Sequence, residues 1–170
     1  MLAIQKNKLH LQHKRRLFKS GLAIILILII IMILMIFQAQ QPVRQARQAT
    51  IRVARRDQRV KTVDDFYVSN LVHPYYTIGG SKANGKKMYV ITDRHHHLVR
   101  AVRVASGINR SYVIRLVRKR DRASKITNVA PAVFNDHTVW VVSYENRNRK
   151  LCYHVFYYDD GKTMQRITNL

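Results

Sequence analysis

The stretch VARRD at residues 53–57 recurs as VRKRD at residues 117–121, 64 residues further along the chain. Two interpretations compete. Clusters of this kind can bind phosphate, or the stretch can mark one structural unit that occurs twice. The spacing defines two halves of equal length, residues 43–106 and 107–170, and their comparison decides between the two interpretations.

The halves align without a gap, and eight of the 64 aligned positions are identical. The identical residues of the first half are Val53, Arg56, Asp57, Lys61, His73, Asn84, Lys86 and Tyr89, and those of the second are Val117, Arg120, Asp121, Lys125, His137, Asn148, Lys150 and Tyr153. These identities are weak by themselves. The order of structural patterns also repeats, and this favours a duplicated unit.

Each half begins with a helical pattern. In the first half, apolar residues recur at spacings of three, four or seven, with Pro42 at a position where a missing N–H costs nothing. These residues are Val43, Ala46, Thr50, Val53 and Val60. In the second half Asn109 is a suitable N-cap. The stripe there is narrower and consists of Val113, Leu116, Val117 and Arg120.

The repeated stretch therefore predicts scaffold rather than a phosphate site. We expect Val53 and Val117 to be the inward anchors of equivalent helices, with the neighbouring Arg and Asp residues in solvent. Asp57 and Asp121 would each pair with a neighbouring Arg, which contributes about 0.3–0.5 kcal/mol on a helix surface.

Four strand patterns follow each helix, rich in Tyr, Val, Ile and Phe. They are DFYVSNLV (65–72), YYTIGG (75–80), KKMYVIT (86–92) and HLVRAVRV (97–104), then ITNVAPAVF (126–134), TVWVVSY (138–144), KLCYHVFYY (150–158) and KTMQRIT (162–168). Turn residues separate them at 82–85, 146–149 and 159–161. The sequence predicts an α+β fold of two tandem units, 43–106 and 107–170, each a helix packed on an antiparallel sheet.

A membrane segment precedes both units. Every residue from Leu22 to Phe37 is apolar, with Gly21 in front. A helix of this length spans about 25 Å, slightly less than the ~30 Å hydrocarbon core, and it has no polar face, which excludes a buried core helix. We expect a transmembrane signal anchor over 21–37.

The flanks of this segment predict its orientation. Residues 1–20 contain six Lys and Arg residues and no acid, which favours a cytoplasmic N-terminus and places residues 43–170 outside the cytoplasm. A cleaved signal peptide is the alternative, although Gln38-Ala39-Gln40 is a poor cleavage site.

The candidates for chemistry are few. His95-His96-His97 suggests a metal site, but a hairpin turn is the simpler interpretation because no further ligand is identifiable. Cys152 and His154 share a strand face without forming a convincing nucleophile–base pair, and Cys152, the only cysteine, is expected to be a small buried hydrophobe. No catalytic motif or phosphate-binding glycine loop occurs. We expect no enzyme activity, no cofactor and no metal, and the binding surface is not identifiable.

The charge is extreme, with 31 Lys and Arg against nine acids and a formal net charge of +22. Outside the cell such a surface meets anionic membrane headgroups or phosphate-rich wall polymers, either of which it attracts without specificity. The expected topology removes genomic DNA from reach, so a nucleic-acid partner is not expected.

The chain resembles the TseB/YpmB-like family of Gram-positive bacteria over its full length. The resemblance is carried by VARRD (53–57), KKMYVITDRHHHLVRAV (86–102), GINRSYVIRLV (107–117) and VWVVSYENRNRKLCYHVFYYDDGKTMQRIT (139–168). It implies membrane-anchored extracytoplasmic proteins with PepSY-like, cystatin-like units that regulate cell-wall elongation, without enzymatic activity, in association with a penicillin-binding protein. A PepSY-like peptidase inhibitor is a further reading, suggested by fold analogy alone.

Overall fold

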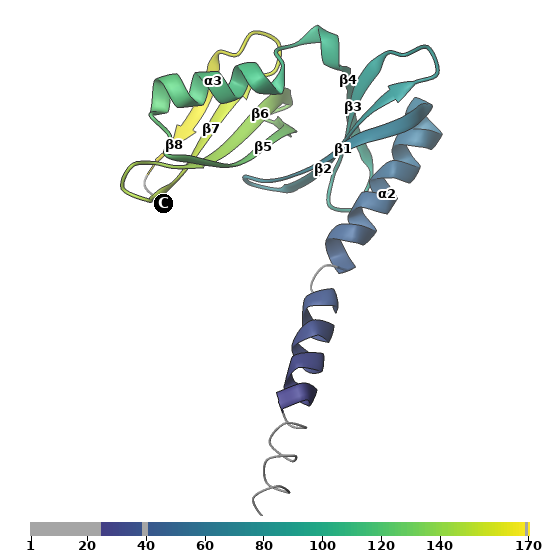
Figure 1. The fold of residues 1–170 in the computed structure, drawn as a ribbon. Coiled ribbons are helices and arrows are strands. Elements are labelled where there is room, and N and C mark those ends of the chain that lie inside the picture. Colours follow the sequence, from purple (N-terminus) through teal and green to yellow (C-terminus); the bar gives the residue numbers. More distant parts are fainter. Residues whose placement is uncertain (1–24, 39–40, 169) are drawn as a thin grey trace, which may run out of the picture. The chain divides into compact units, whose positions relative to one another are not determined.

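The computed structural model of this chain describes residues 25–38, 41–168 and 170 (Figure 1). The chain divides into two compact units, Met1–Arg44 and Gln45–Leu170. The predicted cytoplasmic tail, 1–20, and residues 21–24 of the predicted anchor lie outside the described residues. Residues 25–38 are helical and exposed. They belong to the candidate membrane span Ile25–Gln58, which is long and apolar enough to cross a membrane by length and composition, with a mean hydropathy of 2.2 in an 18-residue window.

The first half of the chain contributes one helix and one antiparallel sheet of four strands in the order β1-β2-β3-β4. The elements are α2 (Gln41–Gln58), β1 (Val60–Asn70), β2 (Pro74–Lys82), β3 (Lys87–Thr92) and β4 (Leu98–Arg103). A short 3-10 turn, η1 (Val104–Ser106), leads into the second half.

The second half contributes a helix and another antiparallel sheet, in the order β5-β6-β7-β8. The elements are α3 (Arg110–Asp121), β5 (Lys125–Phe134), β6 (His137–Glu145), β7 (Leu151–Tyr157) and β8 (Thr163–Ile167). The mixed α+β class and the eight predicted strands are confirmed, although several boundaries shift by a few residues, most of all at the start of β1.

Helix α2 buries its apolar stripe against the first sheet. Ala54 is fully buried in a cluster with Ile78 of β2 and Val90 of β3, and the predicted anchor Val53 is also buried. Two members of the predicted stripe are corrected. Val43 is 50% exposed, and Val60 lies in β1, because Arg59 adopts a left-handed φ of 53° that ends the helix before it.

Helix α3 begins as predicted. The side chain of Asn109 accepts a hydrogen bond of 2.8 Å from the backbone N–H of Tyr112, which is the N-cap geometry. Val113 and Val117 are fully buried, in a core that includes Trp140 and Phe156. The end of the helix differs from the prediction, because the side chain of Asp121 is buried.

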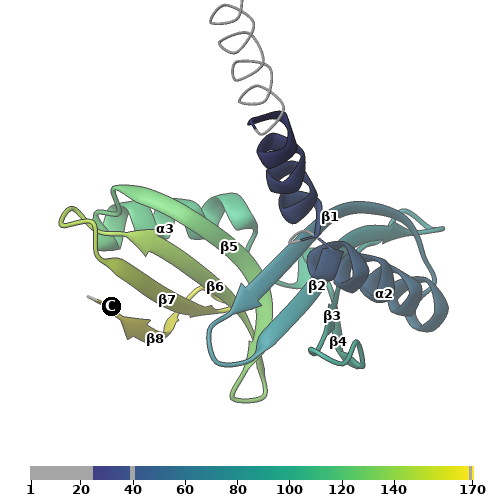
Figure 2. The ribbon, with the colours of Figure 1, turned by 90° about the horizontal axis from the view of Figure 1, so that it is seen from below.

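The two sheets share cores within the compact unit Gln45–Leu170. Tyr89 lies beside Val90 in β3 but belongs to the core of the second half, with Trp140 and Tyr158. Strand β5 contacts β1 and β2 (Figure 2), and the hydroxyl of Thr77 donates to the carbonyl of Pro131 at 2.9 Å. Burial between the sheets therefore adds to burial beneath each helix.

The connection between the halves is held by two aromatic residues of the second half. The Tyr158 hydroxyl donates to the carbonyl of Arg103 at 2.9 Å. The indole N–H of Trp140 donates to the carbonyl of Ile108 at 3.0 Å. A Cβ on Gly107 would lie 2.3 Å from the Tyr158 ring, so only glycine fits at this point. We name residues 103–108, with Trp140 and Tyr158, the junction clamp.

Candidate functional site

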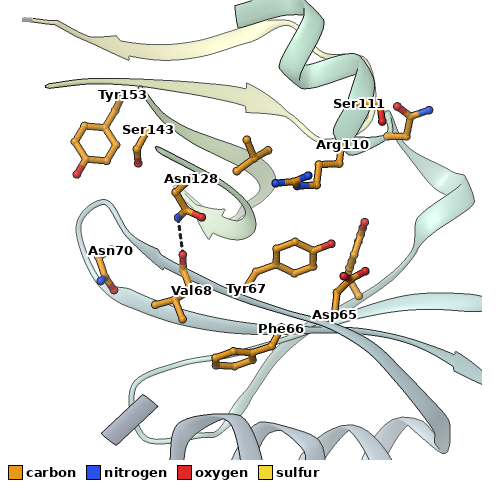
Figure 3. A pocket seen from close by; sticks show the side chains of 13 residues that line it. Asp65, Phe66, Tyr67, Val68, Asn70, Arg110, Ser111, Asn128, Ser143 and Tyr153 are labelled. Carbon is orange, nitrogen blue, oxygen red and sulfur yellow. Dashed lines mark hydrogen bonds between the residues drawn. The ribbon is translucent and has the colours of Figure 1, made fainter. Parts of the chain in front are cut away.

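A groove of about 880 Å³ opens between β1 and the second half of the chain (Figure 3). Both halves contribute to its walls. The lining residues are Asp65, Phe66, Tyr67, Val68, Asn70, Tyr89, Asn109, Arg110, Ser111, Asn128, Val129, Ser143 and Tyr153. Because strands of one half and the helix start of the other form it, the groove depends on the packing of the two halves.

The side chains of β1 beside the groove alternate in direction. Asp65 and Tyr67 point toward the second half, whereas Phe66 points to the opposite side of the strand (Figure 3), where it packs with the α2 core. Gly79 on β2 makes room for this arrangement, since a Cβ there would lie 3.3 Å from both the Asp65 Cβ and the Tyr89 ring.

Two tyrosines and a carboxylate share the floor of the groove. The rings of Tyr67 and Tyr89 meet edge to face with centroids 5.9 Å apart. Burial raises the pKa of Tyr67 far above its ordinary value, and the neighbouring Tyr89 and Asp65 raise it further. Burial also raises the pKa of Tyr89, and the neighbouring Tyr67 and Arg110 oppose this only in part. Both phenols therefore stay neutral and can donate hydrogen bonds.

One hydrogen bond crosses the groove. The side-chain amide of Asn128 in β5 donates to the carbonyl of Val68 in β1 at 2.7 Å (Figure 3). At the rim, Arg110 and Ser111 begin α3 and are exposed. Aromatic faces, neutral donors, one carboxylate and one guanidinium suit the recognition of a polypeptide segment.

A second polar cluster lies where α3 meets β7 and β8, and it corrects a prediction. Asp121, which we expected in solvent beside an Arg, has a side chain with 0% exposure. Its Oδ2 lies 2.6 Å from Nδ1 of His154, and its Oδ1 lies 3.0 Å from Nη2 of Arg166. Nε2 of His154 in turn lies 2.8 Å from the hydroxyl of Thr163. By contrast, Asp57 pairs with Arg56 at 2.6 Å, as predicted.

The order Asp121–His154–Thr163 has the hydrogen-bond connectivity of an acyl-transfer triad. However, the His154 side chain is 3% exposed and its ring stacks on Phe156 at 3.9 Å. Arg166 also engages the carboxylate that a triad would reserve for the histidine. We interpret the cluster as a structural network that joins the end of α3 to β7 and β8.

The remaining sequence candidates are accounted for by the fold. His95-His96-His97 form the turn between β3 and β4, where Oδ1 of Asp93 accepts from the backbone N–H groups of His95 and His97 at 2.9 and 2.8 Å. Among the described residues no group of three or more His, Cys, Asp or Glu could hold a metal ion. Cys152 is buried, as predicted.

The sequence did not point to the groove. Asp65, Tyr67 and Asn128 are separated along the chain and come together only where the halves pack. A weak signal existed in β1, whose sequence VKTVDDFYVSN lacks a simple apolar–polar alternation. A strand with apolar or aromatic side chains on both faces is expected to pack against other elements on both faces.

Comparison with known proteins agrees with this architecture. Residues 49–93 match the family model of the cell wall elongation regulator TseB-like domain. The YpmB protein from Bacillus subtilis has a similar structure, with a TM-score of 0.61 and 19% sequence identity over 71% of this chain and 95% of that one.

A protein from Clostridium difficile 630, described as a lipoprotein, is more distant, with a TM-score of 0.39 and 9% identity over 69% of this chain and 89% of that one. No curated protein matches the chain significantly. Residues 49–93 are thus similar to the TseB-like domain, and the fold of the chain is similar to that of YpmB.

Proposed function

We propose that this chain is a membrane-anchored, extracytoplasmic and non-enzymatic regulator of cell-wall elongation that binds a penicillin-binding protein through the groove. The observation that carries the proposal is the groove itself, a mixed aromatic and polar surface of about 880 Å³ assembled from both halves. The TseB-like match over residues 49–93 supplies the regulatory context and includes the groove residues Asp65 and Tyr67.

The two halves are, in this proposal, duplicated helix-on-sheet units of the cystatin-like kind, with domains 43–106 and 107–170. Adding 64 to the bounds of β1 (60–70) gives 124–134, and β5 spans 125–134. The same shift places β3 (87–92) on 151–156, and β7 spans 151–157. The strands of the halves thus keep one register along the chain, which supports a duplication.

The anchor is proposed to span the membrane over 21–37 with the N-terminus in the cytoplasm. The apolar, exposed helix at 25–38 supports the span, and the six basic residues before it support the orientation. Confinement to the membrane surface raises the effective concentration of the partner, so that a weak interface suffices for association.

Site-directed photocrosslinking in membranes tests the proposal. A photoreactive amino acid is placed at Ser111 or Asn70, which are exposed lining residues of the groove, and at Lys119, which is exposed on α3 and outside the groove. We expect Ser111 and Asn70 to capture a protein that fluorescent penicillin labels, and Lys119 to capture none. Absence of such a product, or equal capture from Lys119, would contradict the groove as the interface.

A second candidate function is supported by the surface charge. Helix α2 exposes Arg47, Arg52 and Arg55, and the whole chain carries a formal net charge of +22. A basic module that binds anionic wall polymer or the membrane surface would lose affinity steeply as salt rises, because such binding depends on counterion release and screening. Sedimentation with isolated cell walls at increasing salt tests this, and salt-independent binding would exclude it.

A further inference from the structure

A separate hollow of about 340 Å³ lies where α3 ends beside the turn between β6 and β7. It is distinct from the groove, with which it shares no lining residue. Three arginines line it, Arg122, Arg147 and Arg166, together with Asp121 and Tyr144. Three positively charged side chains around one small hollow favour the binding of an anion.

The charges in this hollow do not cancel. The carboxylate of Asp121 lies against Arg166 at 3.0 Å and against His154 at 2.6 Å. Among the residues that the structure describes, neither Arg122 nor Arg147 forms an ion pair with a carboxylate. Two positive charges therefore remain without a protein counterion.

The backbone around the hollow is fixed by hydrogen bonds. The hydroxyl of Ser124, two residues after Arg122, lies 2.9 Å from the carbonyl of Glu145 and 2.8 Å from that of Asn146. Oδ1 of Asn146 accepts from the backbone N–H groups of Asn148 and Lys150 at 2.9 and 3.0 Å. These contacts join the segment after Arg122 to the turn that carries Arg147.

A buried donor also lines the hollow. Tyr144 is 1% exposed, and its hydroxyl lies beside Arg166 without a hydrogen bond of good geometry among the described residues. Burial raises its pKa, so that the phenol keeps its proton. A buried hydroxyl left in this state is costly, and an anion in the hollow would accept from it.

We propose that this hollow is a binding site for a phosphate group, held by Arg122, Arg147 and Arg166 with the Tyr144 hydroxyl as an additional donor. A guanidinium donates two parallel hydrogen bonds to phosphate oxygens, which favours phosphate over smaller anions. The inference is independent of the proposed function. It also differs from diffuse attraction by a basic surface, because a built site saturates and depends on particular arginines.

The test measures binding of inorganic phosphate by the full-length chain in a phosphate-free, non-ionic detergent, with isothermal titration at constant ionic strength. We expect saturable binding that weakens at least tenfold in Arg147→Gln and in Arg122→Gln. Arg149→Gln is the matched control, since it removes the same charge from the same turn but does not line the hollow. Its affinity should stay within twofold of the wild type.

Two further arms identify the source of the phosphate group. Binding of glycerol-phosphate polymer and of phosphatidylglycerol vesicles is measured, with phosphatidylcholine vesicles as the reference, in the wild type and in Arg147→Gln. The ligand whose binding depends on Arg147 is the source, and dependence of inorganic phosphate alone identifies the free ion. Absence of saturation, or equal losses in Arg147→Gln and Arg149→Gln, overturns the proposal.

Discussion

Tyr89 of the first half packs edge to face against Trp140 of the second, with ring centroids 5.7 Å apart and an interplanar angle of 85°. Tyr89 makes a similar contact with Tyr158, at 6.2 Å. Aromatic pairs in this geometry contribute beyond their buried area. One residue of β3 thus joins the first sheet to two buried aromatic side chains of the second half.

Replacing Tyr89 by alanine tests this contact. We expect Tyr89→Ala to lower the free energy of unfolding by about 3 kcal/mol, as for other buried aromatic truncations. Tyr89→Phe keeps the ring and should cost about 1 kcal/mol or less. Urea unfolding of the full chain in detergent, followed by tryptophan fluorescence, measures both. Equal effects of the two variants would show that the hydroxyl, and not the ring, holds the halves together.

The junction clamp predicts intolerance at Gly107. In Gly107→Ala the new methyl group would lie 2.3 Å from a Tyr158 ring atom and 2.5 Å from the Tyr158 carbonyl oxygen. Overpacking of this kind costs about 2 kcal/mol or more. Gly85→Ala is the control, because it meets no atom within 4 Å and suffers only from its φ of +75°, at about 1 kcal/mol. A smaller loss of thermal stability at Gly107 than at Gly85 would contradict the clamp.

The N-cap of α3 predicts a smaller effect. Asn109→Ala removes the acceptor for the Tyr112 N–H and should cost about 1 kcal/mol, whereas Asn109→Ser, which retains a capping oxygen, should cost a few tenths (about 0.3 kcal/mol). Thermal unfolding followed by circular dichroism distinguishes the variants. Asn109 also lines the groove. Because Asn109→Ser keeps the cap and therefore the start of α3 in place, crosslinking from Ser111 should persist in this variant.

The network at His154 predicts a pH dependence of stability. Burial lowers the pKa of His154, and the pairing with Asp121 only partly opposes this. An unfolded histidine has a pKa of about 6.5, so below that pH the unfolded chain binds a proton that the folded ring binds less readily. Stability should therefore decrease as the pH falls from about 6.5 toward the folded pKa of His154. Above a pH of about 6.5, this histidine should not change the stability.

Urea midpoints of the wild type, His154→Gln and His137→Gln between pH 5 and 8 measure the effect. His137 is the control because it lies exposed at the start of β6. We expect the slope to persist in His137→Gln and to flatten in His154→Gln. An unchanged slope in His154→Gln would assign the dependence to other groups.

The sequence allowed the element order to be predicted because the relevant signals are local. The Asn109 cap, the apolar stripe through Val113 and Val117, and the turn residues at 82–85 act within a few positions of one another, and the structure places them as expected. The alignment of the two halves also helped, because the helix and strand patterns occur in the same order in both.

The long-range relationships were beyond the sequence. Asp57 and Asp121 occupy equivalent positions and each directly follows an Arg, yet one is paired on the surface and the other is buried against His154. The difference arises from partners on β7 and β8, 33 residues or more away. The groove was inaccessible for the same reason, since it exists only after the two sheets pack.

The junction clamp makes the folded structure of each half depend on the other half. A chain cut after Ser106 would leave Tyr67 and Tyr89 facing water. It would also separate the Tyr158 hydroxyl from its acceptor, the Arg103 carbonyl, at 2.9 Å. The two halves therefore depend on one shared core. A substitution that changes the packing surface of one half therefore requires a compensating change in the other half.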